Sequence, residues 1–235
     1  MGVEFNAHDT EVGAFNVFNP DRPEATDRDP DGMVEEMKAF ISITQEKRCL
    51  LDIGALFGVF SLVFTRNKDA VAYAFEPSHH AFPILCDHVN SNPNHNIKPM
   101  QVFVGERSGD LVRCGRDWKH IVANIESSEM ITHTSSSIDD MASELGSVDC
   151  MKIDVESYEC QVLRGASKTI DKFKPVIFLE CHLLTLGVNR ETPQTLMQTI
   201  MDLGYEAKTF RGDAIDSFEP FVKQGRMTRI VLYPK

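Results

Sequence analysis

The stretch LLDIGALFG, residues 50–58, is a short apolar run that leads directly into a turn with two glycines. Apolar runs of this length that end at glycine are typical of buried strands. A helical pattern follows around residues 58–66, so the stretch predicts a strand, a tight turn and a helix. One carboxylate, Asp52, lies near the tip of the strand. An acid in that place indicates that the strand ends at a bound ligand.

The same alternation of strand and helix continues over most of the chain. The expected strands are residues 49–53, 70–75, 100–104, 148–155, 175–181 and 229–234, and the expected helices are residues 33–41, 58–66, 79–90, 137–145, 157–171 and 193–203, the last ending at Gly204. Polar residues 106–135 are expected to hold short antiparallel strands. Alternating strands and helices predict an α/β fold with one mainly parallel sheet and helices on both faces.

Composition narrows the classes of function. The chain has 235 residues, 42% of them hydrophobic, and a formal net charge of −11, which disfavours a nucleic-acid partner. No apolar window is long enough for a membrane span or a signal peptide. Six cysteines without a C-x-x-C pair are expected to be reduced thiols in the cytoplasm. We expect a lid or arm over residues 1–30 and one domain over residues 31–235.

Ligands of such sheets bind at the carboxyl ends of the strands, near the point where the strand order reverses. This criterion needs no motif. The polar residues that it selects are Asp52, Glu76, Asp154, Glu156, Glu180 and His182.

The first turn favours a cofactor that carries positive charge. Gly54 and Gly58 allow close backbone approach, but Asp52 would repel a pyrophosphate in the same pocket. Glu76 ends the second strand about twenty residues later, the place where an acid accepts hydrogen bonds from a ribose diol. These acids predict S-adenosylmethionine, a nucleoside joined to a cationic amino acid. A nicotinamide dinucleotide is the alternative.

Several blocks, in order, resemble the FkbM family of S-adenosylmethionine-dependent methyltransferases. They are LLDIGALFGVFSL at 50–62, YAFEPSHHAFPIL at 73–85, VGERSGDL at 104–111, SSSIDDM at 135–141, VDCMKIDVESYECQVLRGA at 148–166, KPVIFLECH at 174–182 and LGY at 203–205. The resemblance implies a Rossmann-like class I methyltransferase with a seven-stranded, mainly parallel sheet whose last strand is antiparallel. It places the cofactor contacts at Asp52, Gly54, Ala55, Gly58, Glu76, Pro77, Gly105 and Asp154. Ser157 stands where the family usually has glycine, and Glu106 where it usually has aspartate.

The family typically methylates a hydroxyl oxygen, and a neutral hydroxyl needs a base or a Lewis acid nearby. The candidate catalytic residues are Asp154, Glu156, Glu180 and His182, on two strands that should be neighbours. Crowded carboxylates share a proton, raise one another's pKa or bind a cation. We expect Asp154 or His182 to be the base, with Glu156 and Glu180 positioning the acceptor. A divalent metal ion held by the same four residues is the alternative.

Two charges nearby have simpler interpretations. Lys152 is expected to pair with an acid at the strand edge, and Glu159 to be a solvated or helix N-terminal charge. The whole pattern predicts an O-methyltransferase for a saccharide or another small metabolite. The alternatives are a nicotinamide-dependent oxidoreductase and a non-catalytic binding module with the methyltransferase fold, which the Ser157 substitution favours.

Overall fold

The structure, a computed structural model, describes residues 3–4, 16–17, 33–115, 130–183, 186–215, 217 and 228–235. Its elements in chain order are β1 (Val3–Glu4), β2 (Asn16–Val17), α1 (Met33–Thr44), β3 (Cys49–Ile53), α2 (Val59–Phe64), β4 (Val71–Phe75), α3 (Ala81–Ser91), β5 (Ile97–Met100), β6 (Phe103–Val104), β7 (Leu111–Gly115), β8 (Met130–Ser136), α4 (Ile138–Leu145), β9 (Cys150–Ile153), α5 (Glu159–Gly165), α6 (Ser167–Phe173), β10 (Val176–Cys181), the 3₁₀ helix η1 (Leu186–Asn189), α7 (Pro193–Asp202), β11 (Tyr205–Lys208) and β12 (Thr228–Pro234).

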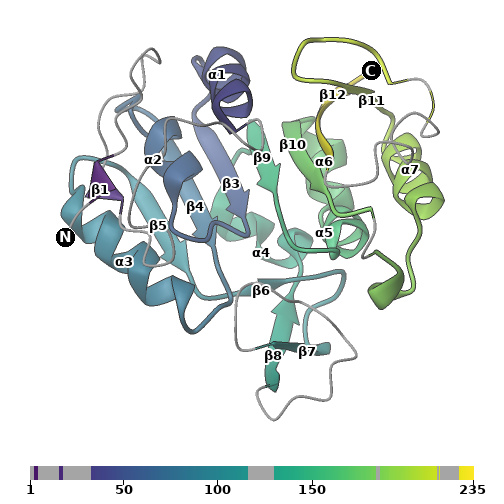
Figure 1. The fold of residues 1–235 in the computed structure, drawn as a ribbon, viewed down its shortest axis with the longest axis horizontal. Helices are drawn as coiled ribbons and strands as arrows, with labels where there is room; N and C mark the ends of the chain where they lie inside the picture. Colours follow the sequence, from purple (N-terminus) through teal and green to yellow (C-terminus); the bar gives the residue numbers. More distant parts are fainter. Residues whose placement is uncertain are drawn as a thin grey trace.

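The central sheet has seven strands in the order β11-β12-β10-β9-β3-β4-β5 (Figure 1). The strands β10, β9, β3, β4 and β5 are parallel to one another, and β12 runs antiparallel to both β10 and β11. The expected mainly parallel sheet with an antiparallel last strand is confirmed. The strand order reverses between β3 and β9, so the ligand crevice is expected at the carboxyl ends of these two strands.

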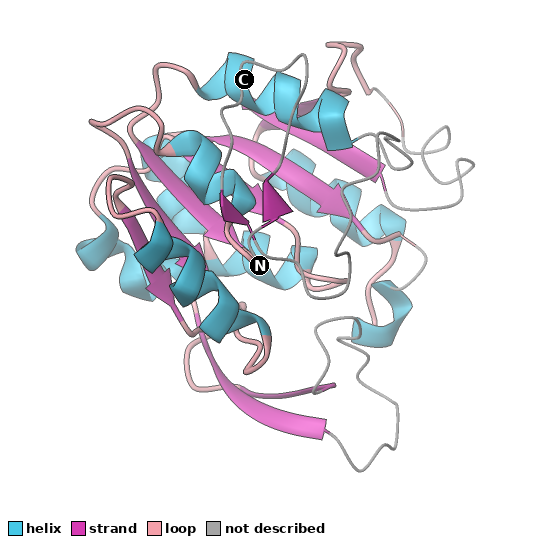
Figure 2. Cartoon of the chain, turned by 60° about the vertical axis from the view of Figure 1, so that its left-hand side comes forward, coloured by secondary structure: helices cyan, strands magenta, loops and turns pink. Residues whose placement is uncertain are grey.

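Helices cover both faces of this sheet (Figure 2), and each face has its own apolar core. Side chains of a strand alternate between the faces, so Leu50 packs with residues of α1, α2 and α3, while Leu51 packs with residues of α4, α5, α6 and α7. Both leucines are fully buried. Truncation of such a residue to alanine typically costs about 2–5 kcal/mol. The apolar faces thus fix the register that brings the polar strand ends together.

The strand expected over residues 100–104 is wrong as a single element. β5 ends at Met100 in the central sheet, and β6 belongs to a separate three-stranded sheet with β7 and β8. The Met100 carbonyl accepts hydrogen bonds from the Glu76 amide at 3.1 Å and from the Val102 amide at 3.0 Å, which turns the chain away from β4. The antiparallel strands expected within residues 106–135 are confirmed as β7 and β8.

The helix expected over residues 157–171 is also different. Glu156 and Ser157 have φ angles of 48° and 81°, which no α-helix contains, so the helix begins only at Glu159. Ala166, with φ −113° and ψ 5°, then separates α5 from α6. Gly204 ends α7 as expected, with a φ of 73°. The short strand β11 that follows it was not expected, because four residues carry little pattern.

The proposed arm over residues 1–30 lies outside the described residues, apart from β1 and β2. These two short strands pair with each other in antiparallel fashion. Within the described ranges, no helix is both long and apolar enough to cross a membrane. The five cysteines whose side chains are described carry free thiols, as the sequence predicts.

Candidate active site

The turn between β3 and α2 is bonded to one neighbouring strand and packed against another. The amides of Gly54 and Ala55 donate to the Phe75 carbonyl at the end of β4, at 2.9 and 3.0 Å. Gly54 has a φ of 81°, and a Cβ on it would lie 1.8 Å from the Asp154 carbonyl oxygen. A Cβ on Gly58, also at φ 81°, would lie 2.5 Å from Leu85. Gly54 is therefore required by the neighbouring backbone, whereas Gly58 is favoured by its φ angle and would meet only the end of the Leu85 side chain.

Glu76 follows β4 directly and ties the turn to that strand end. One carboxylate oxygen accepts from the Leu56 amide and the other from the Ser78 amide, each at 2.8 Å. Burial raises the pKa of Glu76 to about 7, although these two hydrogen bonds favour the charged form. Each oxygen keeps a lone pair, so the carboxylate can still accept from a hydroxyl of a ligand.

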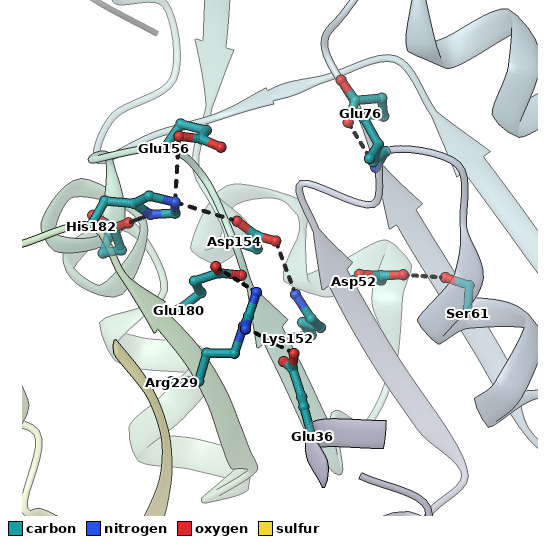
Figure 3. A network of polar contacts seen from close by, with 12 residues as sticks. Glu36, Asp52, Ser61, Glu76, Lys152, Asp154, Glu156, Glu180, His182 and Arg229 are labelled. Carbon is teal, nitrogen blue, oxygen red and sulfur yellow. Dashed lines mark hydrogen bonds and ion pairs between the residues drawn. The ribbon is translucent and has the colours of Figure 1, made fainter. Parts of the chain in front are cut away.

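Asp52 is buried beneath the turn. It is 2% exposed, and its carboxylate accepts a 2.6 Å hydrogen bond from Ser61 on α2 (Figure 3). Burial raises the pKa of Asp52, while the charge of Lys152, which lies opposite it in the register of β3 and β9, lowers it. The sequence analysis did not select Ser61 as a partner. Ser61 lies within the block LLDIGALFGVFSL at 50–62 that resembles the FkbM family, so a sequence signal for it exists.

The four candidate catalytic residues do lie at one edge of the sheet (Figure 3). β9 and β10 are parallel neighbours, which places Asp154 and Glu156 beside Glu180 and His182. The Nε2 atom of His182 lies 3.4 Å from a Glu156 oxygen and 4.0 Å from an Asp154 oxygen. The adjacency expected for these two strands is confirmed.

A buried lysine keeps Asp154 charged. Lys152 is 3% exposed and its Nζ lies 3.3 Å from the Asp154 carboxylate. Burial raises the pKa of Asp154, but the charge of Lys152, a hydrogen bond with Glu180 and the charge of His182 bring it below its ordinary value. Burial and the charge of Asp154 raise the pKa of Glu180 to about 7. Of the two acids, Glu180 is therefore the one that takes up a proton first as the pH falls.

Glu159 contacts the His182 ring at Nδ1, on the side opposite the nitrogen that faces Asp154 and Glu156. The Nδ1 atom of His182 lies 2.6 Å from the Glu159 carboxylate, which is fully buried as the first residue of α5. Burial lowers the pKa of His182, but the hydrogen bond to Glu159 and the charges of Glu159, Glu156 and Asp154 more than offset this, so the pKa rises to about 9. Glu159 is indeed a helix N-terminal residue, yet the solvated charge considered for it is wrong.

Two more charged residues extend the cluster, and sequence analysis missed both. Arg229 on β12 lies opposite Glu180 and contacts its carboxylate at 3.0 Å, while its Nε lies 3.1 Å from Glu36 on α1. Arg229 is the one charged residue of the run RIVLYP, which is a weak signal. Glu36 has no sequence signal, because its burial depends on where α1 lies.

The turn at Glu156 and Ser157 has a left-handed backbone although neither residue is glycine. The Ser157 amide donates to Glu159 at 3.1 Å, and the Asn189 side chain donates to the Ser157 carbonyl at 2.7 Å. These bonds hold φ at 81° for Ser157. The backbone beside Glu156 thus has the conformation that a glycine would supply.

The remaining residues expected at the cofactor lie close to the turn or behind it. Ala55 is buried, and Pro77 is half-buried directly after Glu76. A Cβ on Gly105 would lie 3.1 Å from Ser135, and the Gly105 carbonyl packs against Gly165 of α5. The structure thus gives Gly105 a packing role, and its contact with a cofactor stays a prediction.

The cluster also has the composition of a cation site. One ligand atom each of Asp154, Glu180 and His182 lies within 4.8 Å of the others. Carboxylate oxygens suit Mg²⁺, Ca²⁺ and Mn²⁺. Lys152 and Arg229 already pair with the two acids, so a metal ion would compete with these side chains.

Comparisons with known proteins give one family. The model of the methyltransferase FkbM domain matches residues 52–207. A solved methyltransferase FkbM from Methylobacillus flagellatus KT is 18% identical, with a TM-score of 0.50, over 79% of this chain and 43% of that one. A precorrin-6y C5,15-methyltransferase from Geobacter metallireducens GS-15 is 12% identical, with a TM-score of 0.50, over 86% of this chain and 88% of that one. This chain thus spans less than half of the first structure. No curated protein matches it.

Proposed function

The chain belongs to the FkbM methyltransferase family, and we propose that it transfers a methyl group from S-adenosylmethionine to a hydroxyl oxygen of a saccharide or another small metabolite. The family and the class I fold support methyl transfer. The acceptor is inferred from the acids at the ends of β9 and β10, because a hydroxyl must lose its proton as the methyl group arrives.

One observation carries the proposal: the turn expected to hold the cofactor touches the residue expected to take the proton. A Cβ on Gly54 would lie 1.8 Å from the Asp154 carbonyl oxygen. The two functions therefore meet where the strand order reverses, between β3 and β9.

The residues of the turn fit S-adenosylmethionine. Gly54 and Gly58 present bare backbone, and the two Glu76 oxygens retain acceptor capacity for a ribose diol. Asp52 is buried beside the turn, and its carboxylate form would suit an ammonium or sulfonium group better than a phosphate. When bound, the cofactor supplies a methyl group on a positively charged sulfur.

The chain's own residues would then position and deprotonate the acceptor. Asp154 is the better base of the two candidates, because His182, with a pKa of about 9, already carries its proton at neutral pH. The imidazolium of His182 offsets the repulsion between Asp154 and Glu156. Glu156 and Glu180 offer hydrogen bonds that would orient an acceptor with several hydroxyls.

The test is methyl transfer by the Asp154→Asn variant. Asparagine keeps the shape but cannot take a proton, so turnover should fall about 10²–10⁴-fold while cofactor affinity stays within a few-fold. Asp171→Asn, at an exposed ion pair with Lys174, is the matched control and should change neither. A collapse of cofactor affinity in Asp154→Asn would show that this residue acts on the cofactor.

A metal-assisted mechanism is the second candidate, favoured by the short separations among Asp154, Glu180 and His182. A hard cation there, with Glu156 as a fourth ligand, would lower the pKa of the acceptor hydroxyl. Turnover should then vanish with a chelator and return with Mg²⁺ or Mn²⁺. Unchanged turnover in the chelator leaves Asp154 as the sole base.

The binding-module alternative loses its one hint, since the turn at Ser157 keeps a glycine-like φ. Cofactor binding without turnover on any acceptor would restore that alternative. Cytoplasmic location and the lack of a nucleic-acid or membrane partner remain predictions. The net charge of −11 and the free thiols support them.

A further inference from the structure

We propose that Glu159 is a positioning residue that holds the His182 ring so that its Nε2–H faces Asp154 and Glu156. The inference rests on the proposed methyl transfer, because it assigns a role to a residue behind the acceptor side of that site. Glu159 would act only through His182.

The geometry around the ring supports this role. A carboxylate oxygen of Glu159 lies 2.6 Å from Nδ1, and a carboxylate only accepts, so Nδ1 must carry a proton. The opposite nitrogen, Nε2, lies 3.4 Å from Glu156 and 4.0 Å from Asp154. The ring therefore bridges a buried acid on one side and the two acids of the site on the other.

Glu159 is itself fixed by the chain around it. It begins α5, is 0% exposed, and accepts a 3.1 Å hydrogen bond from the Ser157 amide. The turn that carries this amide is held in turn by the Asn189 side chain, at 2.7 Å from the Ser157 carbonyl. The carboxylate therefore has little freedom to move, and the ring that it holds has little freedom to flip.

Burying Glu159 lowers the free energy of unfolding, which indicates that the residue is kept for function. Its second oxygen, Oε2, is buried without a hydrogen-bond partner among the described residues. A buried polar atom without a partner destabilises the fold, and a buried ion pair is weak evidence for stability. An apolar side chain of similar size would suit the site better if packing were the only demand.

The first experiment compares Glu159→Gln with the wild type in methyl transfer. The amide keeps size and one acceptor oxygen but removes the charge. We expect kcat to fall about 10²-fold, the effect of a small misplacement at a reacting centre, while the dissociation constant of the cofactor changes less than about three-fold. Glu159→Asp should recover part of kcat, since it restores the charge.

Glu191→Gln is the matched control. Glu191 is also buried and ion-paired, with Arg164 at 2.6 Å, but it makes no contact with His182 among the described interactions. Its replacement should leave kcat unchanged even if stability falls. Equal losses of kcat in the two glutamine variants, or an unchanged kcat in Glu159→Gln, would overturn the positioning role.

A second measurement needs no variant of Glu159 and no turnover. Nitrogen-15 NMR of the histidine-labelled wild type, assigned by the signal lost in His182→Gln, should show a slowly exchanging proton on Nδ1 of His182. A ring with bare Nδ1 would overturn the inference even if methyl transfer is confirmed. Failure to methylate any acceptor would instead remove the proposed function and leave the NMR result standing.

Discussion

Replacement of Ser157 by glycine should stabilise the protein. Ser157 has a φ of 81°, in the left-handed region that L-residues other than glycine rarely adopt. The serine therefore carries a backbone strain, and the hydrogen bonds to Glu159 and Asn189 hold the turn in this conformation.

The expected gain is the difference of two terms. Left-handed backbone costs an L-residue roughly 1–2 kcal/mol, which glycine avoids. Glycine adds chain entropy to the unfolded state, which removes about 0.5–1 kcal/mol of that gain. At the midpoints of these ranges the glycine variant should be more stable than an alanine variant by about 0.75 kcal/mol, or about 2–3 °C in Tm for a chain of this size.

Thermal unfolding of the wild type, Ser157→Gly and Ser157→Ala tests this order. Alanine is the right control, since it removes the hydroxyl but keeps the strain. The glycine variant should also retain methyl transfer, because the turn beside Glu156 keeps its shape. An alanine variant as stable as the glycine variant would refute the strain argument.

Three further predictions concern the buried groups of the site. Lys152→Met should destabilise the fold by about 3–5 kcal/mol in chemical denaturation, since it leaves Asp154 without its buried partner. Adding Asp154→Asn should recover part of the lost stability. A loss below about 1 kcal/mol in Lys152→Met would contradict the prediction. Gly54→Ala should abolish cofactor binding in calorimetry, because its Cβ would lie 1.8 Å from a carbonyl, whereas Gly109→Ala, with φ 91° and open space around it, should lose only about 1–2 kcal/mol of stability. Cofactor affinity should weaken as the pH falls below about 7, where Glu76 takes up a proton and becomes a poorer acceptor for a ribose diol; a Glu76→Gln variant with the same pH dependence would show that another group is responsible.

The sequence predicts the sheet and the positions of the site acids well, because both follow from periodic apolar runs and their ends. Asp52, Glu76 and Asp154 each lie where an apolar run stops, so strand ends locate them without side-chain geometry. The run at residues 100–104 is misleading for the same reason. Its apolar pattern is real, yet a pattern does not say that β5 and β6 belong to different sheets.

Side-chain contacts that depend on how strands pair and helices pack cannot be predicted from apolar runs alone. Arg229 reaches Glu180 only because β12 pairs antiparallel with β10. Glu159 contacts His182 only because α5 packs beside the end of β10. In the sequence, an acid at this place indicates only a charge at a helix N-terminus. Glu36 joins them through the position of α1. Each contact joins segments far apart in the chain, so one sequence carries no local signal for it.

The most direct test of this account is a crystal structure with S-adenosylhomocysteine, the demethylated product of the cofactor. The ribose hydroxyls should lie within hydrogen-bond distance of Glu76, with the amino-acid end against the turn at Gly54, above Asp52. A nucleoside bound away from Glu76 would contradict the account. So would a structure in which a diphosphate ligand occupies the turn at Gly54.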